Sequence, residues 1–171
     1  MALTKLNFGG SGQGSIATQV SNNLPSGSVV QVEGNTNDVD VSRVGNTTMI
    51  DSISQTITPT SASNKIVIIG NHHYTLYAKN YNQMKIRLIR TVGGVDTSLL
   101  GENYAYAMHA VNNLYPYDVG GYPMNILDAP NTTSEITYHI MFAHVTNSGQ
   151  NYHLHANHLG TSSIILMEIK G

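Results

Sequence analysis

The sequence has no cysteine among its 171 residues. A disulfide framework, a thiolate nucleophile and a cysteine-based zinc site are therefore excluded. The length fits one ordinary domain, and a domain of this size buries enough surface to fold without cross-links.

Charged residues are also scarce. They make up 11% of the chain, with 8 Lys and Arg, 10 Asp and Glu and a net charge of -2. In an average globular protein about a quarter of the residues are charged. Nucleic-acid binding needs a cluster of basic residues. The densest basic segment, residues 85–90, alternates with apolar residues and is typical of a strand with one solvated face. We therefore expect no nucleic-acid partner.

Long apolar runs are missing too. No stretch approaches the roughly 18 consecutive apolar residues of a membrane span, and the first residues lack the apolar region of a signal peptide. We expect no membrane insertion. We also expect a protein that is made and kept in a cytoplasm, or that reaches the outside only as part of a released particle.

Helical periodicity is absent, and short Ile-, Val- and Thr-rich runs separated by Gly, Pro and Asn take its place. Many short strands with such turns predict a sandwich or barrel. We predict an all-β, antiparallel, jelly-roll-like β-sandwich over residues 24–171. Strands are expected at residues 28–33, 51–58, 65–69, 73–77, 85–91, 97–100, 135–144, 151–155 and 163–169, with an ambiguous run at 41–44.

Residues 1–23 form the second part of the predicted organisation. Residues 8–14 read FGGSGQG, and so many glycines cannot hold a regular element cheaply. The spacing of Gly10, Gly12 and Gly14 resembles that of a phosphate-binding loop. No strand is expected before it and no Lys-Ser/Thr pair follows it, so the pattern does not predict nucleotide binding. We interpret residues 1–23 as a flexible, glycine-rich arm that docks the domain.

A tyrosine-rich segment, residues 103–130, is the first candidate for binding. Its three prolines predict an irregular surface excursion. Tyrosine offers large, stiff, amphipathic contact area, which suits a receptor or subunit contact, although the rings could equally cover the core. The candidate residues are Tyr104, Tyr106, Tyr115, Tyr117 and Tyr122.

Histidine is the second candidate. His153 and His155 would share one face of a strand about 6.5–7 Å apart, with His158 close behind. Together they could hold a metal ion. The alternative is the polar face of an edge strand without a ligand. His72 and His73 would point to opposite faces of a strand and make a weaker pair.

Catalytic constellations are not apparent. The acidic residues are scattered and no two are paired as a glycosidase requires. No Gly-x-Ser-x-Gly elbow exists, and a Ser-His-Asp set could be assembled by chance from so many serines and histidines. We expect no enzyme.

Four segments resemble one family. Residues 24–32 (LPSGSVVQV), 57–68 (ITPTSASNKIVI), 88–90 (LIR) and 160–169 (GTSSIILMEI) occur in order along the chain. They resemble the β-sandwich domain at the ends of tail fibres in marine, cyanophage-like tailed phages. The resemblance implies a virion structural protein with a sandwich fold that forms a homotrimer.

This resemblance shapes the functional expectation. It implies a tail-fibre module for host attachment that binds a host-surface glycan, docks on other virion proteins through the arm and is made in the host cytoplasm. The short segment before the domain leaves a capsid decoration protein as the alternative. No cofactor is expected, except that three copies of His153 and His155 could surround a metal ion on the trimer axis.

Overall fold

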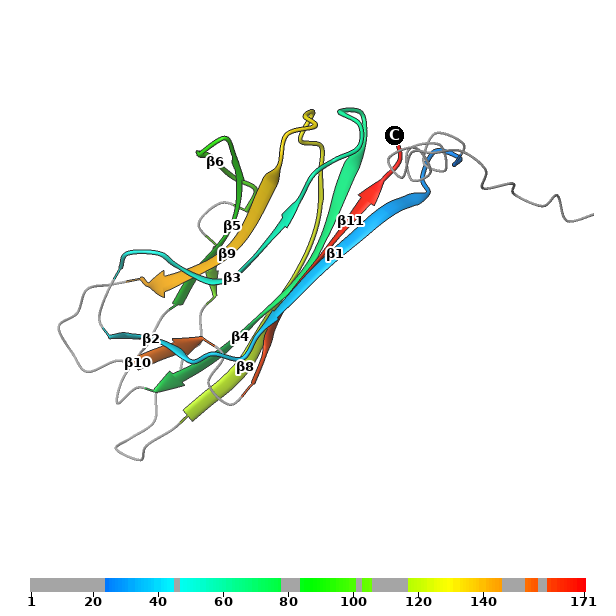
Figure 1. Ribbon diagram of the computed structural model, residues 1–171. Coiled ribbons are helices and arrows are strands. Elements are labelled where there is room, and N and C mark those ends of the chain that lie inside the picture. Colours follow the sequence, from blue (N-terminus) through cyan, green and yellow to red (C-terminus); the bar gives the residue numbers. More distant parts are fainter. Residues whose placement is uncertain are drawn as a thin grey trace, which may run out of the picture.

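The computed structural model describes residues 24–44, 47–77, 84–100, 103–105, 117–145, 153–156 and 160–171. Within these ranges the helices and strands consist of β-strands alone, with no helix, which confirms the all-β prediction (Figure 1). The arm at residues 1–23 lies outside them. The strands are β1 (Val29–Asn37), β2 (Val41–Val44), β3 (Ile50–Ile57), β4 (Lys65–Tyr77), β5 (Met84–Val92), β6 (Val95–Ser98), β7 (Asn103–Ala105), β8 (Tyr117–Asp128), β9 (Ile136–His144), β10 (His153–Ala156) and β11 (Ser162–Ile169).

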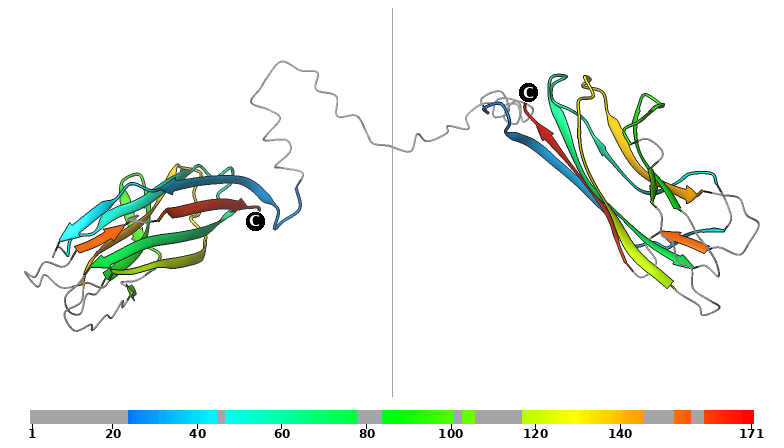
Figure 2. Two further views of the ribbon diagram at one scale, coloured as in Figure 1. Left: turned by 90° about the horizontal axis from the view of Figure 1, so that it is seen from below. Right: turned by 180° about the vertical axis from the view of Figure 1, so that it is seen from behind.

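The strands form two antiparallel sheets (Figure 2). In the first sheet, β4 pairs along one edge with β8 and along the other with β11 and then β10, which lie end to end. β1 pairs with β11 and β2 with β10, so this sheet has four rows. The second sheet has the order β3, β9 and β5, with β6 and β7 pairing with opposite ends of β5.

The order of the rows along the chain identifies the topology. The first row (β1 and β2) pairs with the last (β10 and β11), the second (β3) with β9, the third (β4) with β8, and β5 with β6 and β7. The chain is therefore one long hairpin rolled into two sheets, which is a jelly roll. The jelly-roll prediction is confirmed.

The core lies between the sheets and follows from alternation along each strand. Ile136, Tyr138, Ile140 and Phe142 alternate along β9, and all four are fully buried. Burial of each such side chain stabilises the fold by roughly 1.5–3 kcal/mol. The first sheet contributes Ile66, Ile68, Ile164 and Leu166 to the same cluster.

β4 corrects one prediction. Residues 65–69 and 73–77 were expected as separate strands divided at Gly70, but Lys65–Tyr77 is a single strand. A Cβ atom at Gly70 would lie 2.7 Å from Cδ1 of Ile140 on the facing sheet. The glycine therefore permits a close approach between sheets and does not end the strand. Although residues 65–69 form a continuous apolar run after Lys65, they are not buried on both faces, since Ile69 is 38% exposed.

β8 corrects a second prediction. The irregular excursion expected at residues 103–130 contains a strand of 12 residues. Pro123 is tolerated because, among the described strands, β8 pairs with β4 alone and so lies at the edge of its sheet. Gly120 lies within the strand, where an added Cβ would be 2.6 Å from the hydroxyl oxygen of Tyr74. The ring of Tyr74 occupies the space that a side chain would need.

Glycines also shape the turns between strands. Gly93 and Gly94 form the hairpin turn between β5 and β6, with φ values of 56° and 80° that suit glycine. Before β1, the amide of Ser28 donates to the carbonyl of Pro25 at 3.2 Å, and Gly27 has a φ of 86°. This is the arrangement of a type II turn.

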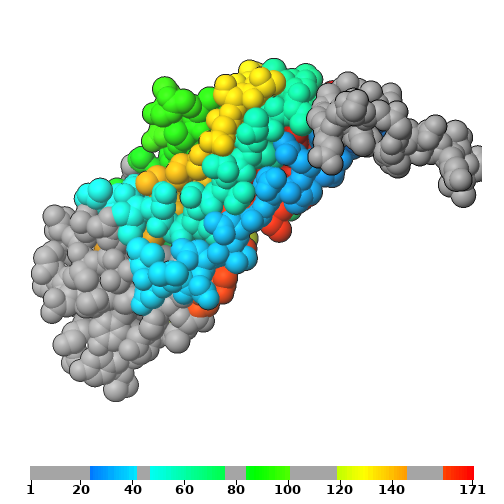
Figure 3. Space-filling view, in the orientation of Figure 1, coloured from blue at the N-terminus to red at the C-terminus, as the bar shows by residue number. Residues whose placement is uncertain are grey.

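The open edge between β1 and β3 is closed by side chains. Side-chain amides of β1 donate to backbone carbonyls of β3 and the residue after it. The pairs are Gln31 to Thr58 at 2.7 Å, Asn35 to Ser54 at 2.9 Å and Asn37 to Ser52 at 2.7 Å. Donors later in β1 bond to acceptors earlier in the segment of β3 and Thr58, which is the order of an antiparallel ladder. Figure 3 shows the atoms of the two strands adjoining along this amide ladder.

Candidate functional site

The five candidate tyrosines are distributed over different elements. Tyr122, on β8, is partly buried and packs against the core. Tyr117 is also in β8, opposite Tyr77, whereas Tyr104 belongs to β7 in the other sheet. Tyr106 and Tyr115 lie outside the described residues. For Tyr122 the structure thus shows a packing role, and a shared receptor surface stays a prediction.

The candidate histidines lie on or near β10. His153 pairs with Val44 on one side and Tyr77 on the other, so β10 is flanked by β2 and β4. The alternative interpretation as an edge strand is therefore wrong. His158 lies outside the described ranges, and the residues that are described contain no group of three His, Cys, Asp or Glu side chains that could hold a metal. A metal site at His153, His155 and His158 stays a prediction.

Glu168 is the most heavily bonded polar side chain that sequence reasoning missed. It lies on the inner face of β11 and is fully buried. Its Oε1 accepts from the Thr60 amide at 2.7 Å, the Thr60 hydroxyl at 3.0 Å and the Asn64 side-chain amide at 2.7 Å. Its Oε2 accepts from the Gln31 side-chain amide at 2.7 Å. Such short contacts are typical of a charged acceptor. Here neutral donors offset the cost of burying the carboxylate.

Three of the four segments that carry the tail-fibre resemblance meet at this carboxylate. Gln31 comes from residues 24–32, Thr60 and Asn64 from residues 57–68, and Glu168 from residues 160–169. The same region is tied to residues just before β1, because the Lys170 ammonium donates to the carbonyl of Leu24 at 2.6 Å. The resembling segments therefore form one framework that joins the first strand, the β3–β4 loop and the last strand.

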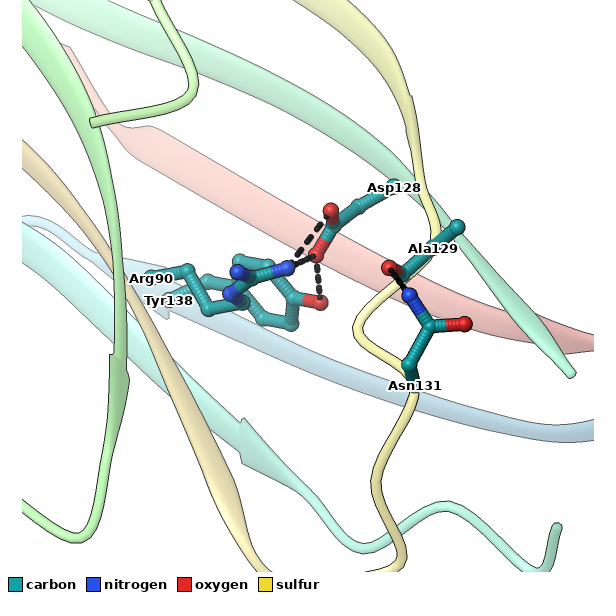
Figure 4. A network of polar contacts seen from close by, with 5 residues as sticks. All are labelled: Arg90, Asp128, Ala129, Asn131 and Tyr138. Carbon is teal, nitrogen blue, oxygen red and sulfur yellow. Dashed lines mark hydrogen bonds and ion pairs between the residues drawn. The ribbon is translucent and has the colours of Figure 1, made fainter. Parts of the chain in front are cut away.

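A second buried polar group joins the two sheets (Figure 4). Nη1 of Arg90 on β5 donates to both carboxylate oxygens of Asp128 on β8, at 2.9 and 3.0 Å. The hydroxyl of Tyr138 on β9 donates to Oδ2 of the same residue at 2.8 Å. Burial, followed by the hydrogen bond to Asp128, raises the pKa of Tyr138 well above its usual value. The phenol therefore stays protonated and serves as a donor.

His72 forms a third buried group. Its Nδ1 lies 2.9 Å from the Ser52 hydroxyl, which in turn lies 3.1 Å from the Ser162 hydroxyl. The imidazole ring centre is 5.1 Å from that of Phe142. Burial, with a smaller contribution from His73, lowers the pKa of His72 to about 3. The ring is therefore neutral at physiological pH and links β3, β4 and β11.

The hydrogen bonds of these three groups join different strands and the β3–β4 loop, whereas Nε2 of His72 and Nε of Arg90 are buried without a hydrogen-bond partner among the described residues. Among the described residues, the exposed His-Asp pair is His139 with Asp51, whose Nδ1 and Oδ2 lie 2.9 Å apart at the surface of the second sheet. The described part of the chain has no helix long and apolar enough to cross a membrane.

No protein-family model and no curated protein matches the sequence. Solved structures match the fold. A chain of infectious bursal disease virus, Gx strain, aligns with a TM-score of 0.50 at 14% identity over 85% of this chain. The VP2 subviral particle of the same virus aligns with a TM-score of 0.47 at 13% identity over 82% of this chain. The Gt strain aligns with a TM-score of 0.49 at 12% identity over 85% of this chain. This chain spans about a third of each, covering 33%, 33% and 34% of their lengths. At these identities the likeness establishes the fold.

Proposed function

We propose that the chain is a non-enzymatic structural subunit of a tailed-phage particle, a homotrimeric attachment module of the tail-fibre type. The observation that carries this proposal is the convergence of the resembling segments on Glu168. Because these segments supply contacts that define the sandwich, their resemblance to fibre-end domains concerns the framework of the fold. The use of the same fold by a chain of a virus, at a TM-score of 0.50, is consistent with a virion component.

The chemistry of the interior supports the non-enzymatic part of the proposal. Glu168, Asp128 and His72 are residue types that catalytic sites often use, yet here each is buried and hydrogen-bonded to another strand or to the β3–β4 loop, which is a structural role. No cofactor is proposed. Host attachment would use a surface glycan as its ligand, with the tyrosines of residues 103–130 as the contacts.

Capsid decoration is the second candidate, because the neighbour with a TM-score of 0.50 comes from a structure of infectious bursal disease virus. Copy number separates the two functions. Quantitative mass spectrometry of purified particles, with antibody labelling under the electron microscope, should find a few trimers per particle, all at the tail. Hundreds of copies distributed over the head would contradict attachment and support decoration.

A further inference from the structure

The outer face of the first sheet carries an apolar surface that the core does not explain. We call it the outer patch. Val32 lies opposite Met167, Met167 opposite Val67 and Val67 opposite Leu127, which gives one row across four strands. Directly opposed residues share a face. The outer patch consists of Val29, Val32, Val67, Ile69, Leu127, Ile165 and Met167, of which Val32 and Leu127 are 56% and 60% exposed.

Charge is nearly absent from this patch. Among the outward positions of its rows, Lys65 is the one charged residue, and it lies at the end, opposite Ile169. The outer face of the second sheet differs, since it carries Asp51 and Asp96. A contiguous, charge-depleted apolar surface is typical of the centre of a protein interface.

The position of the patch indicates what covers it. The chain enters β1 at this end of the sheet, where the amide of Gly27 donates to the carbonyl of Lys170 at 2.8 Å and Val29 lies opposite Ile169. Farther along the same face, Thr36 and Ser163 form a polar row. The apolar half of the face is thus the half beside which residues 1–23 join the domain.

The sequence of residues 1–23 fits this surface. Its first part, residues 1–8 (MALTKLNF), is mainly apolar, with Lys5 as its one charged residue. Residues 9–23 then join it to Leu24. At about 3.3 Å per residue they span up to roughly 50 Å, which exceeds the roughly 26 Å length of an eight-residue strand. The segment is therefore long enough to place residues 1–8 on a neighbouring domain.

We propose that residues 1–8 of one copy cover the outer patch of a second copy. The inference rests on the proposed homotrimer, because each copy then gives one arm and receives one. Such a head-to-tail exchange closes into a ring under threefold symmetry. It also removes the exposed apolar face of every copy from solvent.

Trypsin tests this on the full chain, because Lys5 is the one Lys or Arg within residues 1–23. The initial rate of loss of residues 1–5 is followed by intact-protein mass spectrometry. Val32→Asp, Leu127→Asp and the arm variant Phe8→Asp should each speed cleavage after Lys5 by about tenfold or more, since cleavage reports the undocked population. Val95→Asp is the matched control, because Val95 is 69% exposed on β6 of the other sheet. It should leave the rate unchanged.

Light scattering on the same samples separates this inference from the proposed assembly. A trimer whose Lys5 is cut equally fast in the patch variants, in Val95→Asp and in the unmodified chain would overturn the inference alone. Protection of Lys5 that persists on dilution to monomers would also overturn it, because the arm would then cover its own domain. A monomer at all concentrations would contradict the assembly itself. Protection that disappears together with the trimer supports the proposal.

Discussion

At the scale of single residues, buried polar side chains hold strands that are distant in sequence. Glu168 bonds to Gln31, from which it is separated by 137 positions. The sequence showed a glutamate among scattered acids, and alternation along β11 could have placed it inside. Its partners could not be found in this way, because they come from another strand and a loop whose positions depend on the complete fold.

Replacement of Glu168 by Gln should destabilise the domain by about 2–4 kcal/mol, because an acceptor becomes a donor that faces other donors. Urea unfolding measures the change. Glu33→Gln is the matched control, since Glu33 is an exposed carboxylate on β1, and it should change stability by less than about 0.5 kcal/mol. Equal losses in the two variants would refute the role assigned to the buried carboxylate.

His72 predicts how stability depends on pH. Its pKa of about 3 in the folded state is below the 6.5 of the unfolded state, so between these values the unfolded chain binds more protons. This contribution is complete above pH 6.5 and falls as the pH drops toward 3, by up to about 1.4 kcal/mol per pH unit. Urea unfolding between pH 5 and 7 should show this slope in the unmodified chain and a shallower slope in His72→Phe. Identical slopes would contradict a buried neutral imidazole.

At the scale of strands and turns, alternation in β9 and the Gly93–Gly94 hairpin could be predicted because their signals are local. Gly70 and Pro123 were misread as breaks. Their meaning depends on what lies beside them, namely Ile140 of the facing sheet for the glycine and an unpaired sheet edge for the proline. Sequence alone does not supply these neighbours.

Gly70 gives a prediction at this scale. Gly70→Ala should destabilise the domain by about 1–3 kcal/mol, because the new methyl group would meet Cδ1 of Ile140. Adding Ile140→Val removes that atom and should recover part of the loss. Gly34→Ala serves as the control, since its Cβ would make ordinary contacts at 3.5 Å or more. Thermal unfolding of the unmodified chain, the two single variants Gly70→Ala and Ile140→Val, and their double variant tests the coupling, and strictly additive effects would exclude it.

The amide ladder between β1 and β3 gives another prediction at this scale. Asn37→Asp replaces a donor by a carboxylate facing the carbonyl of Ser52, and it should cost about 1–3 kcal/mol at pH 7. Asn125→Asp changes an exposed residue of β8 in the same way and should have little effect. Denaturant unfolding at pH 7 compares the two. If both variants are as stable as the unmodified chain, the side chains of β1 do not close this edge.

At the scale of the whole molecule, the proposed trimer and its metal are tested together. The trimer should have three times the chain mass of 18.5 kDa by light scattering. If His153 and His155 face its axis, Zn²⁺ or Ni²⁺ should raise the melting temperature and a chelator should lower it. The double variant His153→Ala, His155→Ala should abolish both shifts, and His139→Ala should retain them. A melting temperature that responds to neither reagent would exclude the metal.

The pairing of β1 with β11 has a consequence for how the protein is made. The first strand of the domain finds its backbone partner only when the last strand has been synthesised. Until then Ile66 and Ile68 lack the cover of Ile164 and Leu166, and Gln31 lacks the carboxylate of Glu168. A chain released before β11 is complete thus exposes core residues and is prone to aggregate. Burial of the core residues of β4 therefore depends on synthesis of the chain through β11.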